Sequence, residues 1–167
     1  YTGLVHLGRE AMGTRGIPVH VMPRMEAFLR QYGPWEQLVR AGNVELRSLA
    51  AGQVVRLNDR LSIEPFSVPH RDEYTETVGF VVQGPNHRVL YLPDIDKWER
   101  WDQPIESLLA GVDRSYVDGT FFADGELPNR AMSEIPHPFV VESLARFAPL
   151  PAGERSKIRF IHFNHTN

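Results

Sequence analysis

Histidine and aspartate side chains follow three short apolar runs of the sequence, at points where strands are expected to end. His70 follows the first run, Asp94 the second, and His162 the third, near the end of the chain. Imidazole nitrogens and carboxylate oxygens held together by a rigid sheet are good ligands for a divalent metal ion. His162 is expected to be the last ligand, and His165, further along the same segment, is an alternative.

Metal-assisted hydrolysis is the chemistry that such a site would support. A bound divalent ion lowers the pKa of its water molecule towards neutrality and orients that water for attack. The chain has no cysteine, so any metal must be held by His, Asp or Glu. That ligand set suits zinc first, with manganese or iron as alternatives.

Each of these residues also has an interpretation without function. A histidine after a strand is commonly a surface or hydrogen-bonded loop residue, and an aspartate there is commonly a turn former or a helix N-cap. Only the combination of three strands that end in metal-capable side chains favours a site over these alternatives.

The elements expected to position these side chains are mainly strands. The runs at 61–68 and 78–82 are strand-like, and a Gly-Pro-Asn turn joins the second of them to the run at 89–92. From Val44 to Asp94 the pattern predicts an antiparallel meander of about five strands.

Helices are expected before and after this meander in the sequence. Residues 17–22 form a short, β-branched run that is expected to be a strand. Apolar residues at helical spacing precede it over 4–12 and follow it over 23–41, which is the alternation of a βαβ unit. Residues 96–110 and 137–147 place apolar side chains at helical spacing and are expected to cover the sheet.

Two further polar residues, Asp118 and His137, stand beside these elements. Asp118 ends the strand-like run RSYVD and precedes a glycine, which allows close approach of the backbone. His137 opens the helix expected over 137–147, where free N–H groups attract anions. The alternatives are a turn aspartate that binds its own backbone and a helix-terminal histidine without function.

With these motifs in view, the chain resembles the second half of a metallo-β-lactamase-fold hydrolase. YVDGTFF at 116–122 and HPFVVESLARF at 137–147 are similar to the phosphodiesterase and ribonuclease Z branch, and DGTF and HFNHTN are similar to the PqqB-like group. The resemblance implies an α/β (α+β) fold of the αββα sandwich type.

The resemblance also implies roles for individual residues. Asp94 would bridge the metal ions, and His70 would be a terminal ligand. Asp118 would lie near the metal site as a supporting group, and His137 would act on the scissile phosphate as a general acid or an electrostatic stabiliser. These two residues are therefore the candidates for catalysis.

One family motif, HxHxDH, is absent from the sequence. Tyr1-Thr2-Gly3-Leu4 resembles the residues that follow this motif, so the expectation is a chain that lacks the N-terminal part of the fold; the alternative is a complete small protein. A truncated chain would bind metal weakly, lose activity, and expose apolar surface that favours a homo-oligomer.

Length and composition set the outer bounds. The 167 residues are expected to form a single domain over 1–167. A net charge of -3 makes nucleic acid an unlikely partner and leaves a small-molecule substrate as the expectation. No apolar run reaches the length of about 18 residues that a membrane span needs, and no leader opens the chain, so a cytoplasmic location is expected.

Three classes of function are compatible with these observations. The first is a hydrolase that uses a His/Asp-held metal to attack a phosphodiester- or ester-type substrate. The second, implied by the PqqB-like resemblance, is a metal-dependent oxidative enzyme of cofactor biosynthesis, since His/Asp sites also suit iron. The third is a non-catalytic member that kept the fold and lost the site.

Overall fold

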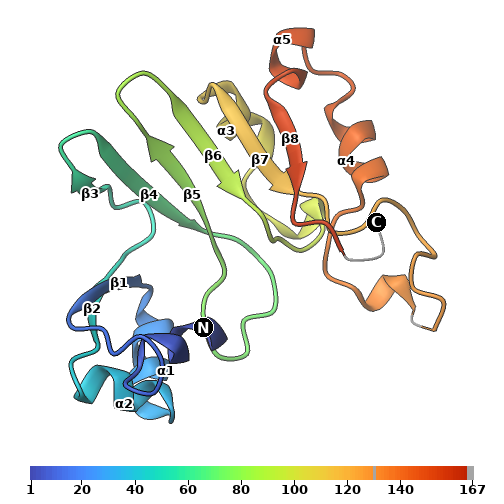
Figure 1. Cartoon of the computed structure of the whole chain (residues 1–167). Coiled ribbons are helices and arrows are strands. Elements are labelled where there is room, and N and C mark those ends of the chain that lie inside the picture. Colours follow the sequence, from blue (N-terminus) through green and yellow to red (C-terminus); the bar gives the residue numbers. More distant parts are fainter. Residues whose placement is uncertain (130, 165–167) are drawn as a thin grey trace. The chain divides into compact units, whose positions relative to one another are not determined.

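The computed structural model of the chain describes residues 1–129 and 131–164 (Figure 1). The chain divides into two compact units, Tyr1–Ala50 with Glu73–Glu76, and Ala51–Asp72 with the residues from Thr77 onward. Both units combine strands with helices, which confirms the expected α/β class. The single domain expected over 1–167 stays a prediction.

The first unit is a small βαβ arrangement. β1 and β2 pair in parallel, with Ile17 opposite Val44, because the two helices between them return the chain to the same end of the sheet. Its elements are η1 (Thr2–Leu7), β1 (Ile17–Val21), α1 (Pro23–Gln31), α2 (Trp35–Arg40) and β2 (Val44–Ser48). The helix expected over 4–12 is a short 3-10 helix, since the chain leaves it at Gly8 in an extended conformation.

The second unit is built on a six-stranded sheet with the order β3-β4-β5-β6-β7-β8. Strands β3 to β6 are antiparallel neighbours, whereas β6, β7 and β8 are parallel. The strands are β3 (Val55–Asn58), β4 (Leu61–Ser67), β5 (Val78–Gln83), β6 (Arg88–Leu92), β7 (Arg114–Asp118) and β8 (Ile158–Ile161). The helices are η2 (Trp98–Arg100), α3 (Ile105–Ala110), η3 (Met132–Glu134), α4 (Val140–Phe147) and α5 (Ala152–Arg155).

The meander expected from Val44 onward is therefore shorter than predicted. The antiparallel series consists of β3, β4, β5 and β6, whereas β2 pairs with β1 in the first unit. The prediction was wrong at β2 because alternating apolar residues identify a strand but not its partner, which tertiary packing chooses.

Strand direction places four strand ends at one edge of the six-stranded sheet. β4 and β6 both run antiparallel to β5, so they share a direction, and β7 and β8 are parallel to β6. Figure 1 shows the arrowheads of β6, β7 and β8 at the same end of the sheet. Side chains that follow these strands are thereby gathered along this edge.

A buried apolar cluster holds the sheet of the second unit against its helices. Leu90 and Leu92 of β6, Ile95, and Ile105 of α3 have no exposed surface. The whole cluster is Val68, Val81, Leu90, Leu92, Ile95, Trp98, Ile105, Leu109, Val112 and Phe147. Because a packed core moves little, the strand ends above it have fixed positions.

A bidentate ion pair joins α3 to α4 beside this core. Arg146 donates through Nε to Glu106 Oε1 at 2.6 Å and through Nη2 to Oε2 at 3.0 Å. The hydrogen bond from Arg146 lowers the pKa of Glu106 below its ordinary value, although burial acts in the opposite direction. The pKa of Arg146 is raised, chiefly by the same bond.

The expected consequence is a contribution to stability that depends on pH. The folded pKa of Glu106 is depressed, so the pair stabilises the fold above the ordinary glutamate pKa of about 4.3 and loses this contribution as the pH falls through the folded value. Arg146→Gln should lower the free energy of unfolding by about 0.5–1 kcal/mol at neutral pH, since both side chains are partly exposed.

Urea denaturation of the parent and Arg146→Gln at about pH 7 and about pH 3 measures this effect. The difference between the two proteins should shrink at the acidic pH. Arg114→Gln, at an exposed position of β7, is the control and should differ little from the parent at either pH. A loss in Arg146→Gln that is the same at both pH values would contradict the prediction.

No helix in the described part of the chain is both long enough and apolar enough to cross a membrane.

Candidate metal centre

The predicted site residues meet at the edge where the four strands end. His70 follows β4, Asp94 follows β6, Asp118 is the last residue of β7, and His162 directly follows β8. His137 joins them from the segment before α4. Their ligand atoms form two groups, each within 4.8 Å: His70 with Asp94 and His137, and Asp94 with Asp118 and His162.

Asp94 is common to both groups. Its Oδ1 atom lies 3.1 Å from His70 Nε2 and 3.5 Å from His137 Nδ1. Neither contact has the alignment of a hydrogen bond: in the part of the chain that the structure describes, Asp94 Oδ1 and His70 Nδ1 are buried without a hydrogen-bond partner. Such a buried acceptor is costly unless a donor or a cation lies beside it, so this cluster fits a divalent metal ion.

Asp118 is fully buried and accepts hydrogen bonds on both carboxylate oxygens. Oδ1 accepts from the backbone N–H of Thr120 at 2.8 Å and from its hydroxyl at 2.7 Å. Oδ2 accepts from the N–H of Ile95 at 3.2 Å and lies 2.7 Å from His137 Nδ1. The aspartate therefore binds its own backbone and also lies beside His137. Its role as a supporting group near a metal stays a prediction.

His162 lies at the exposed side of the site. Its backbone has φ 64, a left-handed conformation that non-glycine residues adopt rarely. Its Nδ1 atom lies 2.9 Å from the hydroxyl of Thr120. His165, the alternative ligand predicted from the sequence, lies outside the described residues.

Two segments of the site are tied together by contacts that the sequence did not reveal. Lys97 donates to both oxygens of Glu142 at 2.9 and 2.7 Å and lies 3.6 Å above the ring of Phe139. Glu142 also accepts the backbone N–H of Phe139 at 2.8 Å, which caps α4. The segment after Asp94 is thereby fixed to the start of α4, next to His137.

Thr120, Lys97 and Glu142 were missed because their roles depend on partners distant in sequence. Thr120 had the only usable signal: a hydroxyl two residues after a candidate aspartate is placed to bond back to it. For Lys97 and Glu142, which are 45 residues apart, no local pattern indicated the contact.

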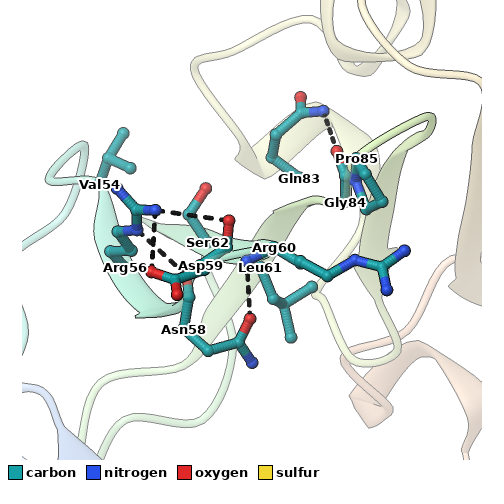
Figure 2. A pocket seen from close by; sticks show the side chains of 10 residues that line it. All are labelled: Val54, Arg56, Asn58, Asp59, Arg60, Leu61, Ser62, Gln83, Gly84 and Pro85. Atoms are coloured by element: carbon teal, nitrogen blue, oxygen red, sulfur yellow. Dashed lines mark hydrogen bonds and ion pairs between the residues drawn. The ribbon is translucent and has the colours of Figure 1, made fainter.

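A separate cavity of about 380 Å³ lies at the turns that join β3 to β4 and β5 to β6 (Figure 2). Arg56, one of its two arginines, pairs with Asp59 at 3.2 Å. The lining residues are Val54, Arg56, Asn58, Asp59, Arg60, Leu61, Ser62, Gln83, Gly84 and Pro85. None of the candidate metal ligands is among them, so this cavity is not part of the metal centre.

Comparison with known sequences gave a family and a relative. A sequence model of the family described as "Beta-lactamase superfamily domain" matches residues 1–163. "Coenzyme PQQ synthesis protein B" of Methylobacterium nodulans (strain LMG 21967 / CNCM I-2342 / ORS 2060) is 30% identical over 103 residues, which cover 57% of this chain and 32% of that protein. The matched part of the chain thus spans about a third of this relative's length.

Solved structures with a similar fold include three that are longer than this chain. Zn²⁺-bound PqqB from Methylobacterium extorquens has a TM-score of 0.74 at 21% identity, covering 99% of this chain and 56% of that one. A diphosphatase from the PhnP family has a TM-score of 0.56 at 19% identity, covering 95% and 51%. Unliganded yeast PDE1 has a TM-score of 0.58 at 11% identity, covering 89% and 49%.

Proposed function

Because this chain belongs to the β-lactamase superfamily and has the metallo-β-lactamase fold of a PqqB-like protein, we propose that it is a metal-dependent hydrolase. The fold expected from the sequence is confirmed. His70, Asp94 and His162 would hold a divalent metal ion, zinc first, and the substrate would be a small molecule with a phosphodiester or ester bond.

The observation that supports this proposal most strongly is the environment of Asp94 Oδ1. A buried carboxylate oxygen, 3.1 Å from one imidazole and 3.5 Å from another without an aligned hydrogen bond to either, is unfavourable in the metal-free protein. Proteins keep such arrangements where a ligand compensates for the cost. A cation bound by Asp94 together with His70 would supply that compensation.

His137 and Asp118 have a separate role in the proposed reaction. Asp118 accepts backbone N–H groups on both oxygens, so it acts as an acceptor towards His137 Nδ1, which therefore holds a proton. Nε2 is then the atom of His137 that exchanges a proton, and it would protonate the leaving group as a general acid. A bound divalent ion would supply a water of lowered pKa as the nucleophile.

The substrate class is supported by fold likeness. The solved structures of similar fold include a diphosphatase and yeast PDE1, and the superfamily's fold supports several hydrolytic chemistries. The bond hydrolysed is therefore proposed as a class, a phosphodiester or an ester.

A second candidate follows from the PqqB-like relatives. The curated relative is named as a protein of coenzyme PQQ synthesis, and Zn²⁺-bound PqqB has the highest TM-score of the three structures described above. A metal-dependent oxidative step in cofactor biosynthesis would use the same His/Asp ligands with iron. A non-catalytic member of the family would bind no metal.

Metal content and hydrolysis measured on the same protein separate these candidates. With the HxHxDH part of the fold present, the parent should retain zinc near one equivalent or above and hydrolyse bis(p-nitrophenyl) phosphate or p-nitrophenyl acetate, and His70→Ala should lose both properties. The 167 residues alone, which lack that motif, should bind zinc more weakly and hydrolyse little. His137→Ala should retain zinc and lose about 100-fold in hydrolysis, as expected for a general acid. His20→Ala, in β1 of the first unit, is the control and should match the parent.

Other outcomes would overturn the hydrolase proposal. Oxygen consumption by the iron-loaded protein without hydrolysis would favour the oxidative enzyme. A folded protein that binds neither zinc, manganese nor iron would favour the non-catalytic member.

A further inference from the structure

The hydroxyl of Thr120 lies between Asp118 and His162. It is 2.7 Å from Asp118 Oδ1 and 2.9 Å from His162 Nδ1. The backbone N–H of the same threonine also donates to Asp118 Oδ1, at 2.8 Å. One residue thus connects the buried carboxylate to the most exposed histidine of the site.

The direction of each hydrogen bond follows from the number of hydrogens available. Ionised Asp118 only accepts, so the single hydrogen of the Thr120 hydroxyl points towards Oδ1. The hydroxyl oxygen therefore presents a lone pair to His162 Nδ1, so it can only accept a hydrogen bond from that nitrogen. A neutral His162 must therefore hold its hydrogen on Nδ1, which leaves the lone pair on Nε2.

We infer that Thr120 is a positioning residue that holds His162 in the Nδ1–H tautomer and so makes Nε2 its metal-binding atom. The inference rests on the proposed function, in which His162 is a ligand. A second hydrogen bond on the other ring nitrogen of a metal-binding histidine fixes its tautomer and orientation.

The backbone on both sides of this contact fixes its geometry. The N–H of Gly119 donates to Ile161 O at 2.8 Å, and the N–H of Asn164 donates to Thr120 O at 3.0 Å. The left-handed conformation of His162, between these two bonds, leads the chain out of the ladder of β8 at this residue. The Thr120–His162 contact is thereby held at a fixed place and does not depend on a free loop.

Asp118 consequently orients two histidines. Its Oδ2 atom holds His137 Nδ1 directly at 2.7 Å, and its Oδ1 atom acts on His162 through Thr120. The two imidazole centroids are 6.3 Å apart. Both rings have Nδ1 in contact with this network, so one buried carboxylate sets the proton arrangement of both.

The tautomer of His162 tests this inference without a metal. Long-range ¹H–¹⁵N correlation spectra of the ¹⁵N-labelled, metal-free chain in alkaline buffer should show neutral His162 with its hydrogen on Nδ1. Assignment uses His162→Gln. A hydrogen on Nε2 in the parent would overturn the inference, whatever the metal affinity of the protein.

Variants of Thr120 test its effect on the metal. Thr120→Val has nearly the same shape without the hydroxyl and should show a mixture of tautomers and about 10-fold weaker zinc binding in competition with a chromophoric chelator. Thr120→Ser retains the hydroxyl and should behave like the parent. Parent-like affinity and a single Nδ1–H tautomer in Thr120→Val would overturn the inference.

His162→Ala separates this inference from the proposed function. Weak zinc binding in His162→Ala together with unchanged binding in Thr120→Val would reject the role of Thr120 and retain the site. Parent-like zinc binding in His162→Ala would reject His162 as a metal ligand. It would also reject the proposal that Thr120 positions His162 for metal binding.

Discussion

Asp94→Ala should weaken zinc binding by at least about 100-fold and leave the metal-free protein as stable as the parent or more stable. Replacing a hydrogen-bond partner of a metal ligand typically weakens metal binding by about 10–100-fold. Asp94 belongs to both groups of candidate ligands, so its replacement should weaken zinc binding more than that. The gain in stability is expected because the substitution removes a buried carboxylate oxygen without a hydrogen-bond partner among the described residues.

Competition with a chelator and thermal unfolding of metal-free protein measure the two effects together. Asp102→Ala, at an exposed aspartate just before α3, is the matched control and should change neither quantity. Lower stability of metal-free Asp94→Ala, with zinc affinity intact, would identify Asp94 as a structural residue and contradict the prediction.

Asp118→Ala should lower the free energy of unfolding by about 3–5 kcal/mol. The substitution leaves the N–H groups of Thr120 and Ile95 and the Nδ1–H of His137 without their acceptor at a fully buried position. Removal of one partner from a buried charged network has this magnitude, because the remaining groups keep their desolvation cost. Loss on this scale is a large part of the stability of an ordinary domain.

Urea denaturation compares the free energy of unfolding of Asp118→Ala with that of Asp113→Ala. Asp118 is the last residue of β7, and Asp113 directly precedes the strand. Asp113 is half exposed and accepts one backbone N–H, from Arg88 at 2.7 Å. Its replacement should cost about 1 kcal/mol or less. Equal losses in the two variants would show that the buried network around Asp118 adds little to stability.

The order of the site residues along the chain was predictable, because each follows an apolar run. An apolar strand that stops at a polar residue marks the edge of a sheet, so His70, Asp94 and His162 were expected at such an edge. The hairpin of β5 and β6 followed from its turn residues in the same way.

The roles of Asp118 and His137 could be assigned from the sequence only by resemblance. Their separation of 19 residues gives no local signal of a hydrogen bond. The contact arises because the segment before α4 is fixed beside the end of β7: Val140 N donates to Phe121 O at 2.9 Å. Packing of a loop against a strand end is a tertiary event that periodicity does not encode.

The sequence by itself determined which residue types end the strands and therefore the kind of chemistry, since metal-binding and proton-transfer groups are properties of side chains. The tertiary structure decided strand order, and with it the 3.1 Å approach of His70 to Asp94. It also decided which histidine meets Asp118 directly and which meets it through Thr120. Distances and hydrogen-bond directions depend on pairs of residues far apart in the chain, and only the folded core brings those pairs together.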